Sequence, residues 1–204
     1  KATKLQTIFD RISLIDTRFE VLKRDVQIAA LRRLLDMRTK ANPEAESACW
    51  AECWKELGTL DDEREFLRRT NVGGEAMSAE DQQRVRDIGT RHTWRNPSGV
   101  DADFLSADEI ENLSIRAGTL TAKEREIINH HIVATIKMLE ALPWPRHLKN
   151  VAEYAGGHHE RMDGKGYPKG LTRDQMSLPA RMMGIADIFE ALTAKDRPYK
   201  PGMK

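Results

Sequence analysis

Hydrophobic residues recur every three or four positions along residues 4–36. The repeated apolar positions are Leu5, Ile8, Ile12, Ile15, Phe19, Leu22 and Val26. This spacing keeps one seam for about three heptads, which is the pattern of a helix packed lengthwise on another helix. We therefore predict one long helix over residues 4–36.

A second long helix is predicted to follow. Asn42 is a favourable cap, and Pro43 suits the first turn, where no backbone donor is needed. The apolar face of this helix contains Trp50, Cys53, Trp54, Leu57 and Leu60. Together the two segments predict an antiparallel helical hairpin. Two interpretations of the hairpin stay open: a coiled-coil element for signalling or dimerisation, and an insertion that braces the domain.

The next part of the chain shows short helices separated by loops. Ser78 is followed by acidic residues and predicts a helix to about Gly89, and Ser106 with Glu109 begins another. Between them, residues 93–105 are expected to form an exposed loop because they contain proline and glycine. No convincing strand is recognisable, so the pattern predicts an all-α fold.

The last third of the chain continues this helical pattern. Its predicted elements are a helix that begins with a capping box at Thr121 and ends near Leu142, a helical segment over 147–157, a loop over 163–171 and a helix over 177–194. The expected core residues of the last helix are Met182, Met183, Ile185, Ile188, Phe189 and Leu192.

Composition limits the possible functions. Hydrophobic residues make up 40% and charged residues 32% of the chain, which is enough to bury a core beneath a solvated exterior. The formal net charge is +1, so general DNA or RNA binding is not expected. No apolar run approaches the roughly 18 residues of a membrane span, and no membrane contact is expected. We expect a cytoplasmic protein, or the cytosolic part of a larger sensor, with Cys49 and Cys53 as reduced thiols.

The candidate chemistry lies in the second half of the chain. Five of the six histidines fall between residues 130 and 159. A single histidine on a helix is more often a surface or core residue than a ligand. Asp187, however, lies in an apolar stretch, and a buried carboxylate needs a compensating charge that a metal ion can supply. His158 and His159 are adjacent and point in different directions, so they can ligate two different ions, and such a ligand set suits iron, manganese or zinc.

Three segments in this region resemble the HD-GYP family. Residues 158–171, HHERMDGKGYPKGL, closely match the family's HHExxDGxGYPxGL signature. Residues 118–131 resemble its GKLTPEE…H segment, and residues 186–200 resemble its ADxxDALTAxDRPYK segment. The likeness covers about residues 106–200, with the segments in the family's order.

The resemblance implies roles for particular residues. The implied metal ligands are His131, His158, His159 and Asp187, whereas His130 fills a position that is usually not a ligand. The implied substrate-binding residues are Gly164, Gly166, Tyr167 and Pro168 in the loop beside the active site, with Arg197 and Lys200 near the dinucleotide phosphates. The implied cofactor is a group of two or three divalent metal ions, with iron or manganese as the first choice. No further catalytic residue is identifiable.

The resemblance also implies a fold and a reaction. The fold is an HD-domain-like helical bundle, with residues 106–204 as its core and residues 1–105 as a helical hairpin insertion with short helices. The reaction is metal-dependent hydrolysis of a cyclic dinucleotide in bacterial second-messenger signalling, such as cyclic di-GMP to pGpG or GMP. A general HD phosphohydrolase acting on nucleotides fits less well, because such enzymes lack the GYP loop.

One part of the family pattern is absent. The His-Asp dyad that gives the family its name does not occur in the sequence. The opening segment resembles the family's K-x-x-KL run, which follows the dyad closely, so we expect the dyad just before Lys1 and further helices beyond residue 204. The 204 residues alone are then expected to have weak or no activity. The alternative is a degenerate, non-catalytic module that binds a ligand or a protein partner through the GYP loop and the hairpin. The hairpin is also a candidate surface for a homodimer.

Overall fold

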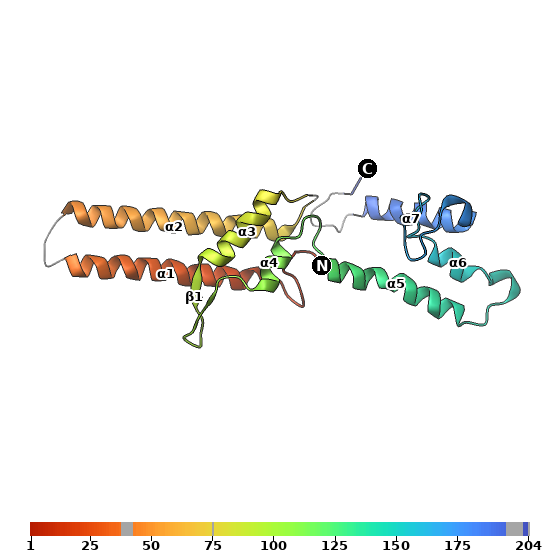
Figure 1. Ribbon diagram of the computed structural model, residues 1–204, viewed down its shortest axis with the longest axis horizontal. Helices are drawn as coiled ribbons and strands as arrows, with labels where there is room; N and C mark the ends of the chain where they lie inside the picture. The colour runs from red at the N-terminus through yellow and green to blue at the C-terminus, as the bar shows by residue number, and fades with distance from the viewer. Residues whose placement is uncertain (38–42, 75, 195–201, 204) are drawn as a thin grey trace. The chain divides into compact units, whose positions relative to one another are not determined.

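In the computed structural model, the first long helix packs along a second, antiparallel helix (Figure 1). Helix α1 spans Ile12–Met37 and helix α2 spans Pro43–Val72. Ion pairs follow the antiparallel register, because later residues of α1 pair with earlier residues of α2. These pairs are Asp16 with Arg68, Glu20 with Arg64 and Lys23 with Asp61. The predicted helical hairpin is confirmed.

The structure describes residues 1–37, 43–74, 76–194 and 202–203, and Asn42, the expected helix cap, lies outside them. The chain divides into two compact units, Lys1–Thr121 and Ala122–Lys204. Helices dominate both units, so the all-α fold class is confirmed. The boundary that we predict between residues 105 and 106, with an insertion before it and a family core after it, stays a prediction.

The first helix begins later than the apolar spacing predicts. Residues 4–11 are not helical, and α1 starts at Ile12. The carboxylate of Asp10 accepts the Ile12 amide at 3.2 Å, and such a local turn competes with helix formation. The segment before it pairs with the end of α2 instead, where the Lys4 amide donates to the Asn71 carbonyl oxygen at 2.7 Å.

Two capped helices complete the helical part of the first unit. Helix α3 spans Ala79–Arg91 and helix α4 spans Ala107–Leu113. The side chains of Ser78 and Ser106 each accept a backbone amide from the first turn, so both predicted caps are confirmed.

Residues 93–105, predicted to be an exposed loop, contain a short β-hairpin. Strands β1 (Thr93–Arg95) and β2 (Asp101–Asp103) pair antiparallel. The side chain of Asn96 accepts two amides of the connecting turn, at 3.0 and 3.1 Å. The prediction of no strand is therefore wrong here, because three-residue strands are too short to show an alternating pattern.

A cluster of buried side chains holds the first unit together. Its members are Leu5, Ile15, Phe19, Leu22, Leu60, Phe66, Leu67, Val85, Ile88, Phe104, Leu105 and Leu113. The rings of Phe19 and Phe104 meet edge to face, with centroids 4.6 Å apart. Cys49 and Cys53 belong to a second buried cluster. Trp54, predicted on the same apolar face, is 65% exposed, which corrects that prediction.

The described part of the second unit is built from three α-helices. Helix α5 spans Ala122–Glu140, helix α6 spans Val151–Gly156 and helix α7 spans Leu178–Thr193. Short 3-10 turns at Arg146–Leu148 and Arg173–Gln175 precede α6 and α7. Helix α6 contacts both α5 and α7. Among the helices that the structure describes, none combines the length and the apolar composition needed to cross a membrane.

The expected core residues of α7 are not buried. Their exposed fractions range from 41% to 67%, and they are Met182, Met183, Ile185, Ile188, Phe189 and Leu192. Ala180, near the start of the helix, is buried instead. The apolar pattern predicts the helix correctly but overestimates its burial, because burial depends on which elements cover each face.

Candidate metal centre

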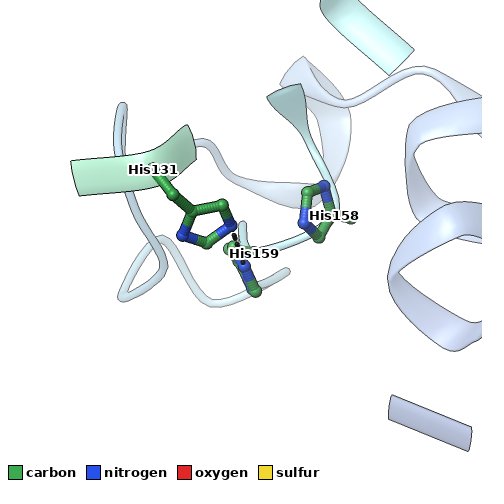
Figure 2. Close-up of side chains that lie close together, drawn as sticks. All are labelled: His131, His158 and His159. Carbon is green, nitrogen blue, oxygen red and sulfur yellow. Dashed lines mark hydrogen bonds between the residues drawn. The ribbon is translucent and has the colours of Figure 1, made fainter. Parts of the chain in front are cut away.

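Three of the predicted metal ligands lie together in the second unit (Figure 2). His131 lies on α5, and His158 and His159 follow directly after α6. Gly184 of α7 allows a close approach to this segment, because a Cβ at that position would lie 3.2 Å from the His158 carbonyl oxygen. The packing of α6 between α5 and α7 therefore positions the three imidazoles.

The imidazole nitrogens converge. One ring nitrogen from each of the three histidines lies within 4.8 Å of the others. Nε2 of His131 and Nε2 of His159 are 3.3 Å apart (Figure 2). Two histidine nitrogens that bind the same metal ion at about 2.0–2.1 Å lie about 2.9–3.4 Å from each other when the N–metal–N angle is between about 90° and 110°. The observed separation therefore fits a shared cation.

Backbone carbonyl groups fix the tautomers of two of these histidines. Nδ1 of His131 donates to the Ile128 carbonyl oxygen, and Nδ1 of His158 donates to the Ala155 carbonyl oxygen, both at 2.5 Å. Because a carbonyl only accepts, Nδ1 carries the hydrogen and Nε2 of the neutral ring keeps its lone pair. This is how protein backbones commonly orient histidines that bind metals.

Asp187 lies beside His159 and outside the group of converging nitrogens. Its carboxylate oxygen is 3.8 Å from Nδ1 of His159, the ring nitrogen that does not face His131. The carboxylate is 45% exposed, so the expectation of a buried carboxylate in an apolar helix is wrong. Burial, followed by the neighbouring His158, lowers the pKa of His159, while Asp187 acts in the opposite direction. The lowered pKa favours the neutral ring that metal ligation requires.

The loop after the histidines is attached to His159. The Tyr167 amide donates to the His159 carbonyl oxygen at 3.2 Å, and the two rings stack with centroids 4.8 Å apart. Gly166 is required at this approach, because a Cβ there would lie 2.5 Å from the Cα of Glu160. Gly164 adopts a positive φ of 75°, which favours glycine. The glycines of the loop thus shape its course past the metal centre.

Glu160 is a positioning residue to which the sequence pattern alone gave no role. It is 8% exposed, and its two carboxylate oxygens accept the amides of Lys169 and Leu171 at 2.7 and 2.8 Å. These bonds satisfy the buried carboxylate and fix the far side of the loop. An acidic residue directly before a glycine-rich loop, whose amides need acceptors, is the signal that could have identified it.

Tyr167 and Pro168 also line an open groove of about 540 Å³. Its other lining residues are Glu126, Ile127, Asn129, His130 and Val133, all on α5. Burial, followed by the charge of Asp187, raises the pKa of Tyr167, so its hydroxyl group stays protonated. Arg197 and Lys200, the predicted phosphate-binding residues, lie outside the described residues.

The HD domain family matches residues 67–204, which include the three histidines and the loop. The chain is 40% identical over 88 residues to a 3'3'-cGAMP-specific phosphodiesterase 3 of Vibrio cholerae and 40% identical over 87 residues to a cyclic di-GMP phosphodiesterase of Pseudomonas aeruginosa. Each alignment covers 43% of the chain. The chain belongs to the HD-GYP family of HD domains.

A further relative gives higher identity over a shorter segment. The 3'3'-cGAMP-specific phosphodiesterase 1 of Vibrio cholerae is 55% identical over 53 residues, or 26% of this chain. The aligned segments represent 12%, 18% and 20% of the lengths of these three relatives, so the chain spans a small part of each.

Proposed function

We propose that this HD-GYP chain belongs to a metal-dependent phosphodiesterase that hydrolyses a cyclic dinucleotide, such as cyclic di-GMP to pGpG or GMP. The observation that carries the proposal is the convergence of three histidine nitrogens beside the signature loop. The names of the relatives support the substrate class. One relative is named for 3'3'-cGAMP and another for cyclic di-GMP, so the names do not determine which bases the substrate carries.

The proposed ligand set is His131, His158, His159 and Asp187. Two or three divalent ions, with iron or manganese as the first choice, would supply charge that neutralises phosphate oxygens and Lewis acidity that activates water. The chain's own contribution is orientation: backbone carbonyls hold His131 and His158, and Asp187 lies beside the outer nitrogen of His159.

The proposed substrate contacts are the GYP loop and two basic residues. Gly164 and Gly166 shape the loop, while Tyr167 and Pro168 face the groove beside the histidines. Arg197 and Lys200 are proposed to bind phosphate, because guanidinium and ammonium groups pair with phosphate oxygens.

Hydrolysis is tested in a protein that also contains the family's His-Asp dyad, which this sequence lacks. Cyclic di-GMP and Mn²⁺ are added, and products are separated by chromatography. His158→Ala and Asp187→Ala are expected to abolish metal-dependent turnover. The exposed His147 is a matched control, and His147→Ala is expected to retain it. Undiminished turnover in either ligand variant contradicts the assigned roles.

A second candidate is a non-catalytic binding or scaffold module. Such a module would keep the fold and bind a ligand or partner through the GYP loop and the hairpin. Metal analysis of the dyad-containing protein separates the two functions. About two ions per chain supports the enzyme, and a metal content near zero supports the scaffold.

We also propose that the hairpin joins two copies of the chain. Helix α1 also carries exposed apolar side chains. Leu14, Ile28 and Leu35 lie at multiples of seven residues with Leu31 between them, and they are 45–61% exposed. A seven-residue spacing matches the same side chains on a second copy. Light scattering at increasing concentration is expected to show a dimer that Leu35→Glu weakens. A monomer at all concentrations contradicts this.

A further inference from the structure

The groove beside the metal centre has one continuous wall from α5. Glu126, Asn129, His130 and Val133 lie at positions i, i+3, i+4 and i+7, which share one face of a helix. Tyr167 lines the groove as well. The volume of about 540 Å³ lies in the range of small-molecule sites, which combine apolar walls with a few polar groups.

Tyr167 connects this groove to the metal centre. Its ring lies against the His159 imidazole at an interplanar angle of 19° and also lines the groove. A flat ligand that contacts Tyr167 in the groove therefore touches a residue that is itself stacked on a proposed metal ligand. A nucleotide base bound there would keep its attached phosphate near the histidine cluster.

The polar groups of the groove are available to a ligand. Among the described residues, the side chains of Glu126 and Asn129 have no hydrogen-bond or ion-pair partner, and Glu126 is exposed. An ionised carboxylate offers only acceptors. Guanine presents two neighbouring donors, N1–H and the N2 amino group, on its Watson–Crick edge. Adenine presents an acceptor, N1, beside its amino group, and this acceptor would face a carboxylate unfavourably.

We propose that the groove binds a guanine base of the substrate and that the Glu126 carboxylate accepts the N1–H and N2 donors. The amide of Asn129, one turn along the same face, offers a donor for the guanine O6. The Tyr167 ring provides the surface on which the base stacks. This inference rests on the proposed function and deepens it, because it names the base and the residue that distinguishes it.

The experiment measures binding of cyclic di-GMP, 3'3'-cGAMP and cyclic di-AMP to the Mn²⁺-loaded 204-residue chain by calorimetry. The wild-type chain is expected to bind cyclic di-GMP most tightly and cyclic di-AMP least tightly. In Glu126→Gln, the affinity for cyclic di-GMP is expected to fall about tenfold or more, because a bidentate contact to a base edge is lost. Affinity for cyclic di-AMP is expected to hold or rise, because a glutamine amide can pair with adenine.

The control is Glu140→Gln, the same change at an exposed position near the end of α5. It is expected to reproduce the wild-type order and affinities. Equal weakening of all three ligands by Glu126→Gln, or no wild-type preference for guanine, overturns the inference. If the chain binds none of the three while the dyad-containing protein hydrolyses cyclic di-GMP, the inference fails and the proposed function stands. Guanine-selective binding through Glu126 without any hydrolysis supports the binding site and contradicts the proposed catalysis.

Discussion

The two units of the molecule differ in what they bury. In the first unit, aromatic and aliphatic side chains from α1, α2, α3 and α4 form one cluster, and Phe19 and Phe104 are fully buried in it. In the second unit, α7 leaves apolar side chains such as Phe189 exposed, while the candidate metal ligands gather beside it. Stability in the first unit therefore depends mainly on packing, and the described part of the second unit is organised around polar chemistry.

The buried carboxylates of the two units show the same contrast. Glu109 of the first unit is bound by the Arg18 guanidinium at 2.7 and 3.0 Å. Glu160 of the second unit accepts backbone amides of the loop. One carboxylate joins helices through an ion pair, whereas the other shapes a loop beside the histidines. Buried charge thus supports packing in one unit and site geometry in the other.

The largest expected effect is the loss of a core aromatic side chain. Phe19→Ala should lower the free energy of unfolding of the first unit by about 3–5 kcal/mol, because Phe19 is 0% exposed and the change leaves a cavity. The matched change Phe189→Ala, at a position 67% exposed, should cost less than about 0.5 kcal/mol. Urea titrations followed by circular dichroism measure both. Similar losses at the two positions would remove the contrast between the units.

In the second unit, removal of a candidate ligand should lower the affinity for a metal ion. His131→Ala should weaken Mn²⁺ binding at least about 100-fold, which is the upper end of the loss for residues that merely support a ligand. The adjacent His130 lines the groove and lies outside the cluster, so His130→Ala should retain metal binding. Calorimetric titration with Mn²⁺ measures the affinities. An equal loss of Mn²⁺ affinity in the two variants would mean that His131, whose tautomer the Ile128 carbonyl sets, is not a metal ligand.

Acid should act on the first unit through Glu109. Burial alone would raise the pKa of Glu109, but the Arg18 guanidinium and the Ser106 amide outweigh it and lower that pKa. The stabilisation is therefore complete above the unfolded-state pKa of about 4.3 and is lost as the pH falls through the lower folded-state value.

The neutral variant Glu109→Gln should be less stable at pH 7 by about 1.5–3 kcal/mol and should show a shallower loss in acid. The neighbouring Asp108 pairs with Arg11 and is 63% exposed, so Asp108→Asn should change little. Urea titrations from pH 3 to 7 provide the measurement. If Glu109→Gln loses stability in acid as steeply as the wild-type chain does, other groups cause that loss.

Local signals made part of the fold predictable. Ser78, Ser106 and Ser177 start helices with side-chain bonds to amides three residues ahead, so the information lies within one turn. The adjacent pair His158 and His159 could likewise be recognised from a continuous motif, and the structure brings His131 to them.

Features that depend on distant contacts were missed. The turn at Asp10 replaces the predicted start of α1, because that segment bonds to Asn71 at the end of α2. Glu160 acquires its partners only when the loop folds back on it. The apolar side of α7 has a helical pattern, yet periodicity does not say what covers it, and Phe189 is exposed.

The smallest expected effect concerns a buried cation in the first unit. Lys4 is 2% exposed, and its ammonium donates to the Leu113 carbonyl oxygen at 3.0 Å. Burial lowers the pKa of Lys4 to about 8, and the charge of Asp81 opposes this only partly. The folded protein therefore releases this proton at a lower pH than the unfolded chain does. Between about pH 8 and 10 the unfolded chain binds more protons, so stability rises with pH.

The rise is expected to be at most about 1.4 kcal/mol per pH unit, and solvent screening reduces it. Lys4→Met removes the titrating group and should flatten the curve, whereas Lys55→Met, at an exposed position on α2, should leave the slope unchanged. Urea titrations at pH 7, 8, 9 and 10 measure the slopes. An equal rise in Lys4→Met would mean that the first unit tolerates this buried charge without cost. The difference between the first and the second unit would then lie in apolar packing alone.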